Sequence, residues 1–505
     1  MTLNRNVQQR QFSRLWLIEF GAGPNNAPSY ESLWRAGAAS FPQGDVTAIR
    51  APDPRRYGHF QVIGRIRGEP GLPTLPVTAY YLSDRQSTLL KLARNGCVHD
   101  LQVHMGLCQD PQNFNAGWSK IAVLEKATPT TYGTTDLGSL MASEQEVVNE
   151  EVPFTGESYY EILPVQFAEQ AASQIVQEIV DVRVCDTIVC GECGIPSNGC
   201  DVVLGLTLTA GGSPGLAAEV IYSQDGGATW ADTLIDTLAA NQDPNAFACV
   251  GTNLVVISED SESIHYAPLA DVLNGTETWT EVTTGFVTGN GPLAMISVTA
   301  LHTWIVGENG YIYFTADPTS GVSVLDAGVA TTENLTAIHA LDTENLVAVG
   351  ANNAVVLTRD GGSTWSSVTG PNAGTALNTV WMRGKDQWLV GDAGGQLWYT
   401  LDAGVNWTEK TFPGSGSGSV RHIVFSSPSV GYLAHSTTAP AGRILRTING
   451  GFSWYVLPEA SGFSIPANDY VAKLAPCENE VNLIYGGGLA GNETDGFLVK
   501  ASAAL

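Results

Sequence analysis

The sequence lacks the features that would place it in a membrane. None of its 505 residues falls in an apolar run approaching the roughly 18 residues that a spanning helix needs. The first residues, MTLNRNVQQRQFSRLWLIEFGAG, lack the apolar core of a secretory signal peptide. We therefore expect a chain that is made in the cytoplasm and has no membrane span.

Positive charge is also scarce. The chain has 24 Lys and Arg against 50 Asp and Glu, a formal net charge of −26. Residues 201–505 hold most of the imbalance, with 9 Lys and Arg against 29 Asp and Glu. A surface this acidic repels phosphate backbones and anionic lipids, so the composition argues against specific nucleic-acid binding.

Cysteine and charged residues are too few for two further classes of protein. Eight cysteines in 505 residues do not make a disulfide-dense scaffold. Only 15% of the residues are charged and 55 are glycine, a composition typical of a turn-rich β protein rather than a helical one. The length allows two or more domains, each with its own core.

One short stretch recurs along the second half of the chain. YSQDGGATW at 222–230 combines an acidic residue, two glycines and a tryptophan, which is also how a ligand site can look. LTRDGGSTW follows at 357–365, YTLDAGVNW at 399–407 and RTINGGFSW at 446–454. Repetition at this spacing favours a structural role over a single binding site.

Each copy lies inside a longer unit. Residues 335–369 and 377–412 both read as four short strands in about 40 residues, the pattern of a propeller blade. Trp365, Trp407 and Trp454 are 42 and 47 residues apart, which agrees. Weaker copies at 253–282, 303–325 and 481–502 bring the expected number of blades to seven. Six or eight blades stay open, because the first and last units are the least regular.

The first copy fits the pattern S-x-D-x-G-x-T-W through Ser223, Asp225, Gly227, Thr229 and Trp230. It therefore resembles the Asp-box, or BNR, repeat of sialidases, sortilin-type receptors and photosystem II assembly-factor propellers. The resemblance covers about 300 residues and implies a seven-bladed β-propeller at 201–505.

The residue types of the box suit a turn. Aspartate can accept hydrogen bonds from backbone N–H groups of its own turn, glycine supplies a positive φ, and tryptophan buries a flat surface beside it. Asn449 replaces the aspartate in the last copy, so charge-dependent chemistry would be lost there. We assign structural roles, and no catalytic or cofactor-binding role, to Ser223, Asp225, Gly227, Trp230, Asp360, Gly362, Trp365, Asp402, Gly404, Trp407, Asn449, Gly451 and Trp454.

Half of the cysteines lie between the two parts of the chain. Cys185, Cys190, Cys193 and Cys200 form a C-x4-C-x2-C-x6-C pattern, and C-x2-C is a usual zinc spacing. Two disulfides are the competing interpretation, in a particle that leaves the cell, and unpaired thiols are the third. Zinc or disulfides would be structural and would fix the joint at 185–200; apart from such a zinc we expect no cofactor.

Residues 1–184 carry no box. HFQVIGRIRG (59–68) and LPVTAYYLS (75–83) indicate strands, and RQSTLLKLARNG (85–96) a short amphipathic helix. In arrangement, residues 44–70 and 117–156 resemble tail-tube proteins of long-tailed bacteriophages. The resemblance implies a β-sandwich-like domain with one or two helices that assembles into stacked, usually hexameric, rings. The expected fold is therefore mainly all-β, with an assembly domain at 1–184 before the joint and the propeller.

The leading functional interpretation is a non-enzymatic virion structural protein. It would be a tail-tube-like subunit located in the virion tail, self-assembling into rings or tubes, contacting other virion proteins and carrying the propeller as a surface decoration. The alternative is an adhesion propeller that recognises a host glycan or host protein.

A glycoside hydrolase is the remote alternative. The sialidase resemblance implies an arginine triad over the central mouth of the propeller. This propeller has only Arg359, Arg383, Arg421, Arg443 and Arg446, and Arg359 lies inside a box.

Overall fold

A computed structural model of the chain forms two compact units, residues 1–164 and 165–505, which are described separately. The structure describes residues 14–19, 29–39, 46–52, 60–67, 74–80, 99–106, 118–129, 149–155, 158–170, 178–185, 200–208, 218–239, 242–437, 442–459, 465, 469–477, 480–489 and 496–503.

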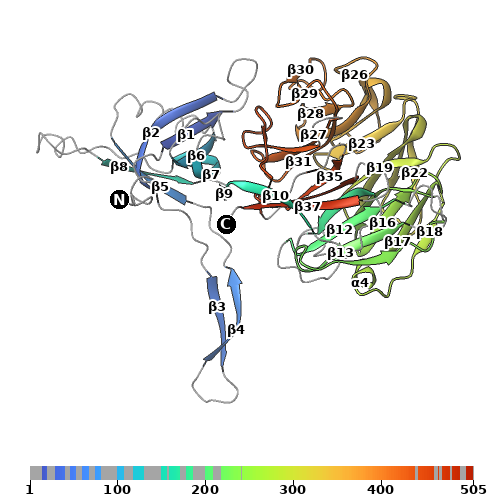
Figure 1. The fold of residues 1–505 in the computed structure, drawn as a ribbon, viewed down its shortest axis with the longest axis horizontal. Helices are drawn as coiled ribbons and strands as arrows, with labels where there is room; N and C mark the ends of the chain where they lie inside the picture. Colours follow the sequence, from blue (N-terminus) through green and yellow to red (C-terminus); the bar gives the residue numbers. More distant parts are fainter. Residues whose placement is uncertain are drawn as a thin grey trace, which may run out of the picture. The chain divides into compact units, whose positions relative to one another are not determined.

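The second unit is a β-propeller of seven four-stranded antiparallel sheets, as the sequence predicts (Figure 1). Blades 1 to 3 are β11 (Ile179–Cys185), β12 (Val202–Thr207), β13 (Glu219–Ser223) and β14 (Ala231–Leu234); β15 (Pro244–Val250), β16 (Asn253–Ser258), β17 (Ser263–Pro268) and β18 (Thr280–Val282); and β19 (Pro292–Thr299), β20 (His302–Gly307), β21 (Tyr311–Thr315) and β22 (Ser323–Ala327).

Blades 4 to 6 repeat the same order of strands along the chain. They are β23 (Leu335–Ala340), β24 (Leu346–Gly350), β25 (Ala354–Thr358) and β26 (Ser366–Thr369); β27 (Leu377–Gly384), β28 (Gln387–Asp392), β29 (Leu397–Thr400) and β30 (Thr408–Lys410); and β31 (Ser419–Phe425), β32 (Gly431–Ser436), β33 (Arg443–Thr447) and β34 (Tyr455–Val456).

Blade 7 takes its strands from both ends of the unit. β35 (Tyr470–Pro476), β36 (Ile484–Leu489) and β37 (Gly496–Ala503) come from the C-terminal end, and β10 (Val165–Glu169) pairs with β37 as the outermost strand. The first strands of neighbouring blades contact one another, including β11 with β35, so the ring is closed. Strands β10 and β11 thus belong to the propeller sheets, although the sequence analysis placed residues 165–184 in the N-terminal domain.

Further contacts close the ring between blades 1 and 7. A disulfide joins Cys200, just before β12, to Cys477, just after β35, with a Cα–Cα distance of 5.8 Å. The Tyr485 hydroxyl and the Lys500 Nζ both donate to the carbonyl oxygen of Gly226, at 2.9 and 2.7 Å. In a closed ring the first and last blades cover each other's inner-facing sheet surfaces, so neither sheet face is left exposed to water there.

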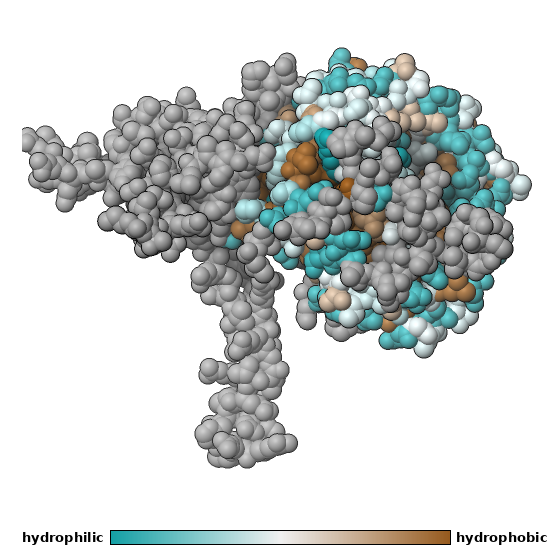
Figure 2. All heavy atoms as spheres, in the orientation of Figure 1, coloured by the Kyte–Doolittle hydropathy of each residue, from teal (hydrophilic) through white to brown (hydrophobic). Residues whose placement is uncertain are grey.

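The core lies between the blades. Second strands such as β12, β24 and β32 are buried along their whole length, because a neighbouring blade covers each face of the sheet. Such strands read as nearly continuous apolar runs, for example LVAVG at Leu346–Gly350, rather than as an alternation. The outer surface is mostly hydrophilic where Figure 2 colours it, with small apolar patches.

The first unit is also built from strands. β1 (Arg14–Glu19), β2 (Ser29–Ala39), β5 (Thr74–Tyr80), β6 (His99–Gly106), β7 (Trp118–Pro129), β8 (Asn149–Thr155) and β9 (Ser158–Ile162) form one sheet in the order β6-β1-β2-β5-β8-β7-β9. A further pairing of β6 with β7 closes this sheet on itself, and β3 (Val46–Pro52) and β4 (Phe60–Arg67) form a separate hairpin.

Helix is rare in the part of the chain that the structure describes. The α-helix found there, α4 (Leu269–Val272), is a single turn in blade 2, and two short 3₁₀ turns, η2 (Glu308–Gly310) and η3 (Ala351–Asn353), lie in blades 3 and 4. The helix predicted at 85–96 lies outside the described residues. None of the described helices has the length and apolar character to cross a membrane.

Candidate functional site: the central channel

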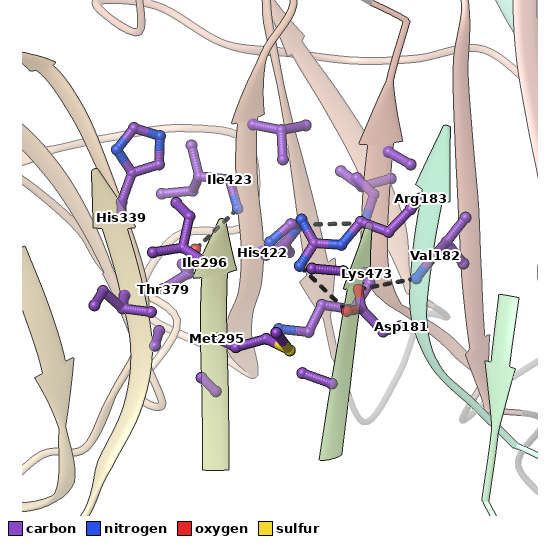
Figure 3. A pocket seen from close by; sticks show the side chains of 18 of the residues that line it. Asp181, Val182, Arg183, Met295, Ile296, His339, Thr379, His422, Ile423 and Lys473 are labelled. Atoms are coloured by element: carbon purple, nitrogen blue, oxygen red, sulfur yellow. Dashed lines mark hydrogen bonds and ion pairs between the residues drawn. The ribbon is translucent and has the colours of Figure 1, made fainter. Parts of the chain in front are cut away.

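The first strands of the seven blades surround a central cavity of about 320 Å³ (Figure 3). We call it the channel. All seven strands contribute residues to its wall, from Asp181 on β11 round to Lys473 on β35.

Every first strand has a register shift at the same place. The pairing with the second strand skips one residue, as in β11 between Ile179 and Asp181 and in β35 between Val471 and Lys473. Such a bulge re-aims the side chain that follows it. The residues directly after the seven shifts all line the channel, and we call them the channel ring: Asp181, Ala246, Ala294, Ala337, Thr379, His422 and Lys473.

Polar members of the channel ring bind the backbone of the next blade. The Thr379 hydroxyl oxygen accepts from the N–H of Ile423 at 3.1 Å, and His422 Nδ1 accepts from the N–H of Leu474 at 3.1 Å. In both cases the donor is one residue beyond the ring member of the following blade. Asp181 Oδ2 accepts from Phe247 N–H in the same way, at a longer 3.4 Å.

A cluster of charged and polar groups occupies one side of the channel, on blades 6, 7 and 1. It consists of Asp181, Arg183, His422 and Lys473, all labelled in Figure 3. Asp181 is only 3% exposed and forms an ion pair with the Arg183 guanidinium at 3.2 Å. Asp181 Oδ1 also accepts from Val182 N–H at 2.9 Å, so both carboxylate oxygens have partners.

Burial perturbs the basic groups of this cluster. It lowers the pKa of Lys473; the Asp181 carboxylate opposes that shift and the Arg183 charge adds to it. Burial, followed by the charges of Lys473 and Arg183, holds the pKa of His422 well below its usual range. His422 is therefore neutral at neutral pH, and the cluster has a formal charge of +1 from two cations and one anion.

The other side of the channel is lined by small apolar side chains. Ring members Ala246, Ala294 and Ala337 lie there on consecutive blades. His339 follows, with Nδ1 accepting from Met382 N–H at 3.3 Å and the ring centroid 4.1 Å from that of Trp381. Burial lowers the pKa of His339 to about 3, so it too is neutral.

The Asp-boxes lie away from the channel, in the hairpins between the third and fourth strands. In the first box the Ser223 hydroxyl donates to Asp225 Oδ1 and accepts from Gly227 N–H, both at 2.8 Å. Asp225 accepts the Thr229 N–H at 2.8 Å and the Thr229 hydroxyl at 2.6 Å. These bonds, the Thr229 hydroxyl first, lower the pKa of Asp225 to about 2.

The other three boxes close the same bonds with their own residue types. Asp360 binds Thr364 as Asp225 binds Thr229, and Asp402 binds the Asn406 amide at 2.7 Å. Asn449 keeps the geometry without a charge, because its Oδ1 accepts Ser453 N–H at 3.0 Å and its Nδ2 donates to the Ser453 hydroxyl at 2.7 Å.

Each box tryptophan packs beside the sheet of the preceding blade. Trp230 lies with Leu498 of blade 7, Trp365 with Ile312 of blade 3, Trp407 with Val355 of blade 4 and Trp454 with Leu389 of blade 5. The glycine before it approaches the same surface, since a Cβ on Gly362 would lie 2.6 Å from Leu325 Cδ1 and one on Gly451 2.8 Å from Leu389 Cδ1. The backbone conformation also requires glycine in the boxes, since Gly227 and Gly404 have positive φ values of 89° and 83°.

Of the four clustered cysteines, the structure describes the side-chain pairing of Cys200. Cys200 forms a disulfide with Cys477, 277 residues away, so the prediction that it pairs with its neighbours or binds zinc with them is wrong. Cys185 ends β11, and Cys190 and Cys193 lie outside the described residues. Elsewhere in the described ranges, no group of three or more His, Cys, Asp or Glu is arranged to hold a metal ion.

The five arginines of residues 201–505 do not meet over the channel, and none of them belongs to its described lining. Arg359 pairs with Asp386 at 2.5 Å, Arg421 donates to the Ser436 hydroxyl, and Arg446 is fully buried against Asn482. The arrangement implied by the sialidase resemblance is therefore not assembled there.

The channel residues could not be identified from the sequence because they belong to no motif. The signal that would have found them is an alignment of the seven first strands on their bulges, which places Asp181, Thr379, His422 and Lys473 in one column with three alanines.

Comparison with known proteins gives one family match. Residues 326–466 match the model of the photosynthesis system II assembly factor YCF48. The photosystem II stability/assembly factor HCF136 of Arabidopsis thaliana is 31% identical over 111 residues, 21% of this chain and 26% of that protein. The match thus spans about a quarter of the length of this relative.

Two solved structures of YCF48 resemble this chain. YCF48 from Cyanidioschyzon merolae superposes with a TM-score of 0.50 at 13% identity, covering 67% of this chain and 99% of that one. A structure of YCF48 bound to D1 peptide gives a TM-score of 0.49 at 13% identity, covering 68% and 96%.

These findings overturn the interpretation of the chain as a virion protein. The matches are to photosystem II assembly factors, so a tail-tube subunit, a location in the virion tail, partners among virion proteins and hexameric self-assembly are wrong. The tail-tube resemblance of residues 1–184 gains no support from them either. The chain is a mainly β protein with a seven-bladed propeller of YCF48-like fold, in which residues 326–466 match the assembly-factor model.

Proposed function

We propose that the chain is a binding propeller of the assembly-factor type, which holds a segment of a protein partner at its central channel and performs no chemistry on it. The observation that carries this proposal is the channel ring. Seven structurally equivalent positions hold three alanines on one side and Asp181, Thr379, His422 and Lys473 on the other. A uniform structural ring would have no need of such an asymmetry.

The channel suits binding because its polar side chains are already held in place. Thr379, His422 and Asp181 are each fixed by a backbone N–H of the next blade, and Arg183 is fixed by Asp181. Groups that are ordered before the ligand arrives lose little conformational freedom on binding. Binding pockets are also typically concave, mostly apolar and supplied with a few placed polar groups, as here.

The same hydrogen bonds argue against catalysis. A general base must accept a proton from the substrate, and the Nδ1 atoms of His339 and His422 already accept backbone N–H groups. The Asp181 carboxylate is engaged by Arg183 and by backbone N–H groups. These side chains therefore shape the channel rather than move protons.

The class of partner follows from the relative that is named a photosystem II stability/assembly factor. We propose that the partner is a subunit of a membrane protein complex, bound while that complex is being assembled. The acidic outer surface would limit contacts elsewhere and favour the channel as the point of contact.

Surface plasmon resonance tests this proposal directly. The full chain is immobilised, and detergent-solubilised photosystem II reaction-centre complexes are passed over it, with cytochrome b6f complexes in the same detergent as the matched control. We expect binding of the photosystem II complexes with a Kd of about 1 μM, near −8 kcal/mol, and none of the control. Equal retention of both complexes, or of neither, would overturn the proposal.

A further inference from the structure

We propose that Arg183, His422 and Lys473 form a carboxylate-binding site in the channel, and that an acidic group of the ligand enters it. This inference rests on the proposed function, because it names the chemistry of the group that the channel would hold. The three side chains come from blades 1, 6 and 7, which are neighbours in the closed ring.

The distribution of charge is the first argument. Residues 165–505 contain 10 Lys and Arg against 34 Asp and Glu. Two of those ten cations, Arg183 and Lys473, line the channel, whereas Asp181 is the one acidic residue in its described lining. The propeller thus concentrates positive charge at its centre while the chain around it is strongly negative.

The environment of Lys473 is the second argument. Its side chain lies at the same level of the channel ring as Asp181 and His422, and its Nζ makes no hydrogen bond or ion pair with any residue that the structure describes. Lys473 is half-buried, so its ammonium group loses part of its hydration, which is costly unless a counter-charge is supplied. Asp181 offsets that cost only in part, because it is already paired with Arg183.

His422 supplies a neutral donor to the same space. Because Nδ1 accepts the N–H of Leu474, we place the ring proton on Nε2, which is then a donor. The ring is close enough to Lys473 and Arg183 for their charges to disfavour its protonated form. An ammonium, a guanidinium and an imidazole N–H together suit an oxyanion.

The balance of charge selects a carboxylate over a phosphate. The cluster of Asp181, Arg183 and Lys473 has a formal charge of +1, which one carboxylate neutralises. A phosphate, with its second pKa near 6, carries close to −2 at neutral pH and would leave an uncompensated negative charge in a confined site.

The opposite wall leaves room for the rest of the ligand. Ala246, Ala294 and Ala337 present only methyl groups to a cavity of about 320 Å³. This volume lies at the lower end of ligand pockets and fits one acidic side chain or a small organic acid, rather than a folded segment.

Isothermal titration calorimetry with the full chain distinguishes the two sources of a carboxylate. The probes are N-acetyl-tetraglutamate amide, its neutral counterpart N-acetyl-tetraglutamine amide, and propionate. We expect the acidic peptide to bind and the neutral peptide not to bind, although the net charge of the chain repels the acidic one. Binding of propionate in competition with the peptide would identify a small acid as sufficient, and its absence would identify a peptide segment as the source.

Variants assign the binding to the cluster. K473M should weaken binding of the acidic peptide at least tenfold, and R183Q should do so independently. K385M, which removes an exposed lysine outside the channel lining, should leave it unchanged. Far-UV circular dichroism and thermal unfolding verify that each variant is folded.

Two results overturn the inference: no binding of either acidic probe, or equal binding to the wild type, K473M and K385M. Its failure is separable from that of the proposed function. Photosystem II complexes that bind the wild type and K473M equally would leave the assembly role intact and exclude the site. Binding of the carboxylate probes without retention of the photosystem II complexes would support the site and exclude the assembly role.

Discussion

The propeller repeats itself in two places, at the Asp-box hairpins, which we call the rim, and at the channel. The rim conserves its residue types from blade to blade, and the channel does not. At the rim, four boxes place similar residues on the same hydrogen bonds, and the change from Asp360 to Asn449 leaves the geometry intact. At the channel, seven equivalent positions hold five residue types, from alanine to lysine.

The difference follows from what each position must satisfy. A rim hairpin has to close its own turn and cover the preceding blade, and those requirements are the same in every blade that carries a box. A channel residue follows a bulge that the backbone forms in all seven blades, whether the side chain is Ala246 or Lys473. The backbone does not constrain which residue type stands at a channel position, so that residue type can be chosen for binding.

Removing a rim tryptophan should give the largest loss of stability. Trp454 is 6% exposed and packs with Leu389 and Phe425, its ring centroid 6.1 Å from that of Phe425. W454A should lower the free energy of unfolding by about 3–5 kcal/mol, because a large buried ring is replaced by a cavity. Guanidinium denaturation measures the change.

W454F is the control for this substitution and should retain most of the stability. Binding at the channel should be the same in both variants as in the wild type. A loss below about 1 kcal/mol in W454A would contradict the view that the box tryptophans hold neighbouring blades together.

A channel substitution that removes a backbone partner should cost less. Thr379 is 2% exposed, and its hydroxyl accepts the N–H of Ile423 at 3.1 Å. T379V keeps the shape of the side chain but leaves that N–H unpaired, so we expect the free energy of unfolding to fall by about 1–3 kcal/mol. T379S, which keeps the acceptor, should lie between T379V and the wild type in the same denaturation experiment. Equal stability of T379V and T379S would show that this bond between blades contributes nothing.

The rim could be predicted from the sequence because its signals are local. The S-x-D-x-G-x-T-W pattern contains its own hydrogen-bond partners within five residues, as Ser223, Asp225 and Thr229 show. Repetition at the length of a blade then gave seven blades and the all-β fold, which the structure confirms.

The closure of the ring and the channel could not be predicted in this way, since both depend on long-range pairing. Residues 165–169 alternate like many strands, and nothing in them points to β37, more than 300 residues further along. Cys200 lies near three other cysteines in sequence, yet its partner is Cys477. The channel ring depends on where each first strand is bulged, which the pairing register defines and composition does not.

The smallest effect should be the pH dependence of the unfolding temperature that the charge of one rim box causes. It is seen by comparing a box with a charged aspartate and the same box with an uncharged asparagine. Bonds from Thr364, its hydroxyl first, lower the pKa of Asp360 from 3.8 to about 2. Because the folded-state pKa is the lower one, the carboxylate stabilises the fold above about pH 4, and this contribution is lost as the pH falls towards 2. D360N, which copies the uncharged Asn449 box, should therefore unfold at a lower temperature than the wild type at pH 7, and the gap should narrow through that window. Thermal unfolding of both proteins between pH 7 and pH 2 measures it. A gap that stays constant with pH would mean that the Asp360 charge does not strengthen the turn, and that the rim boxes are equivalent in energy as well as in geometry.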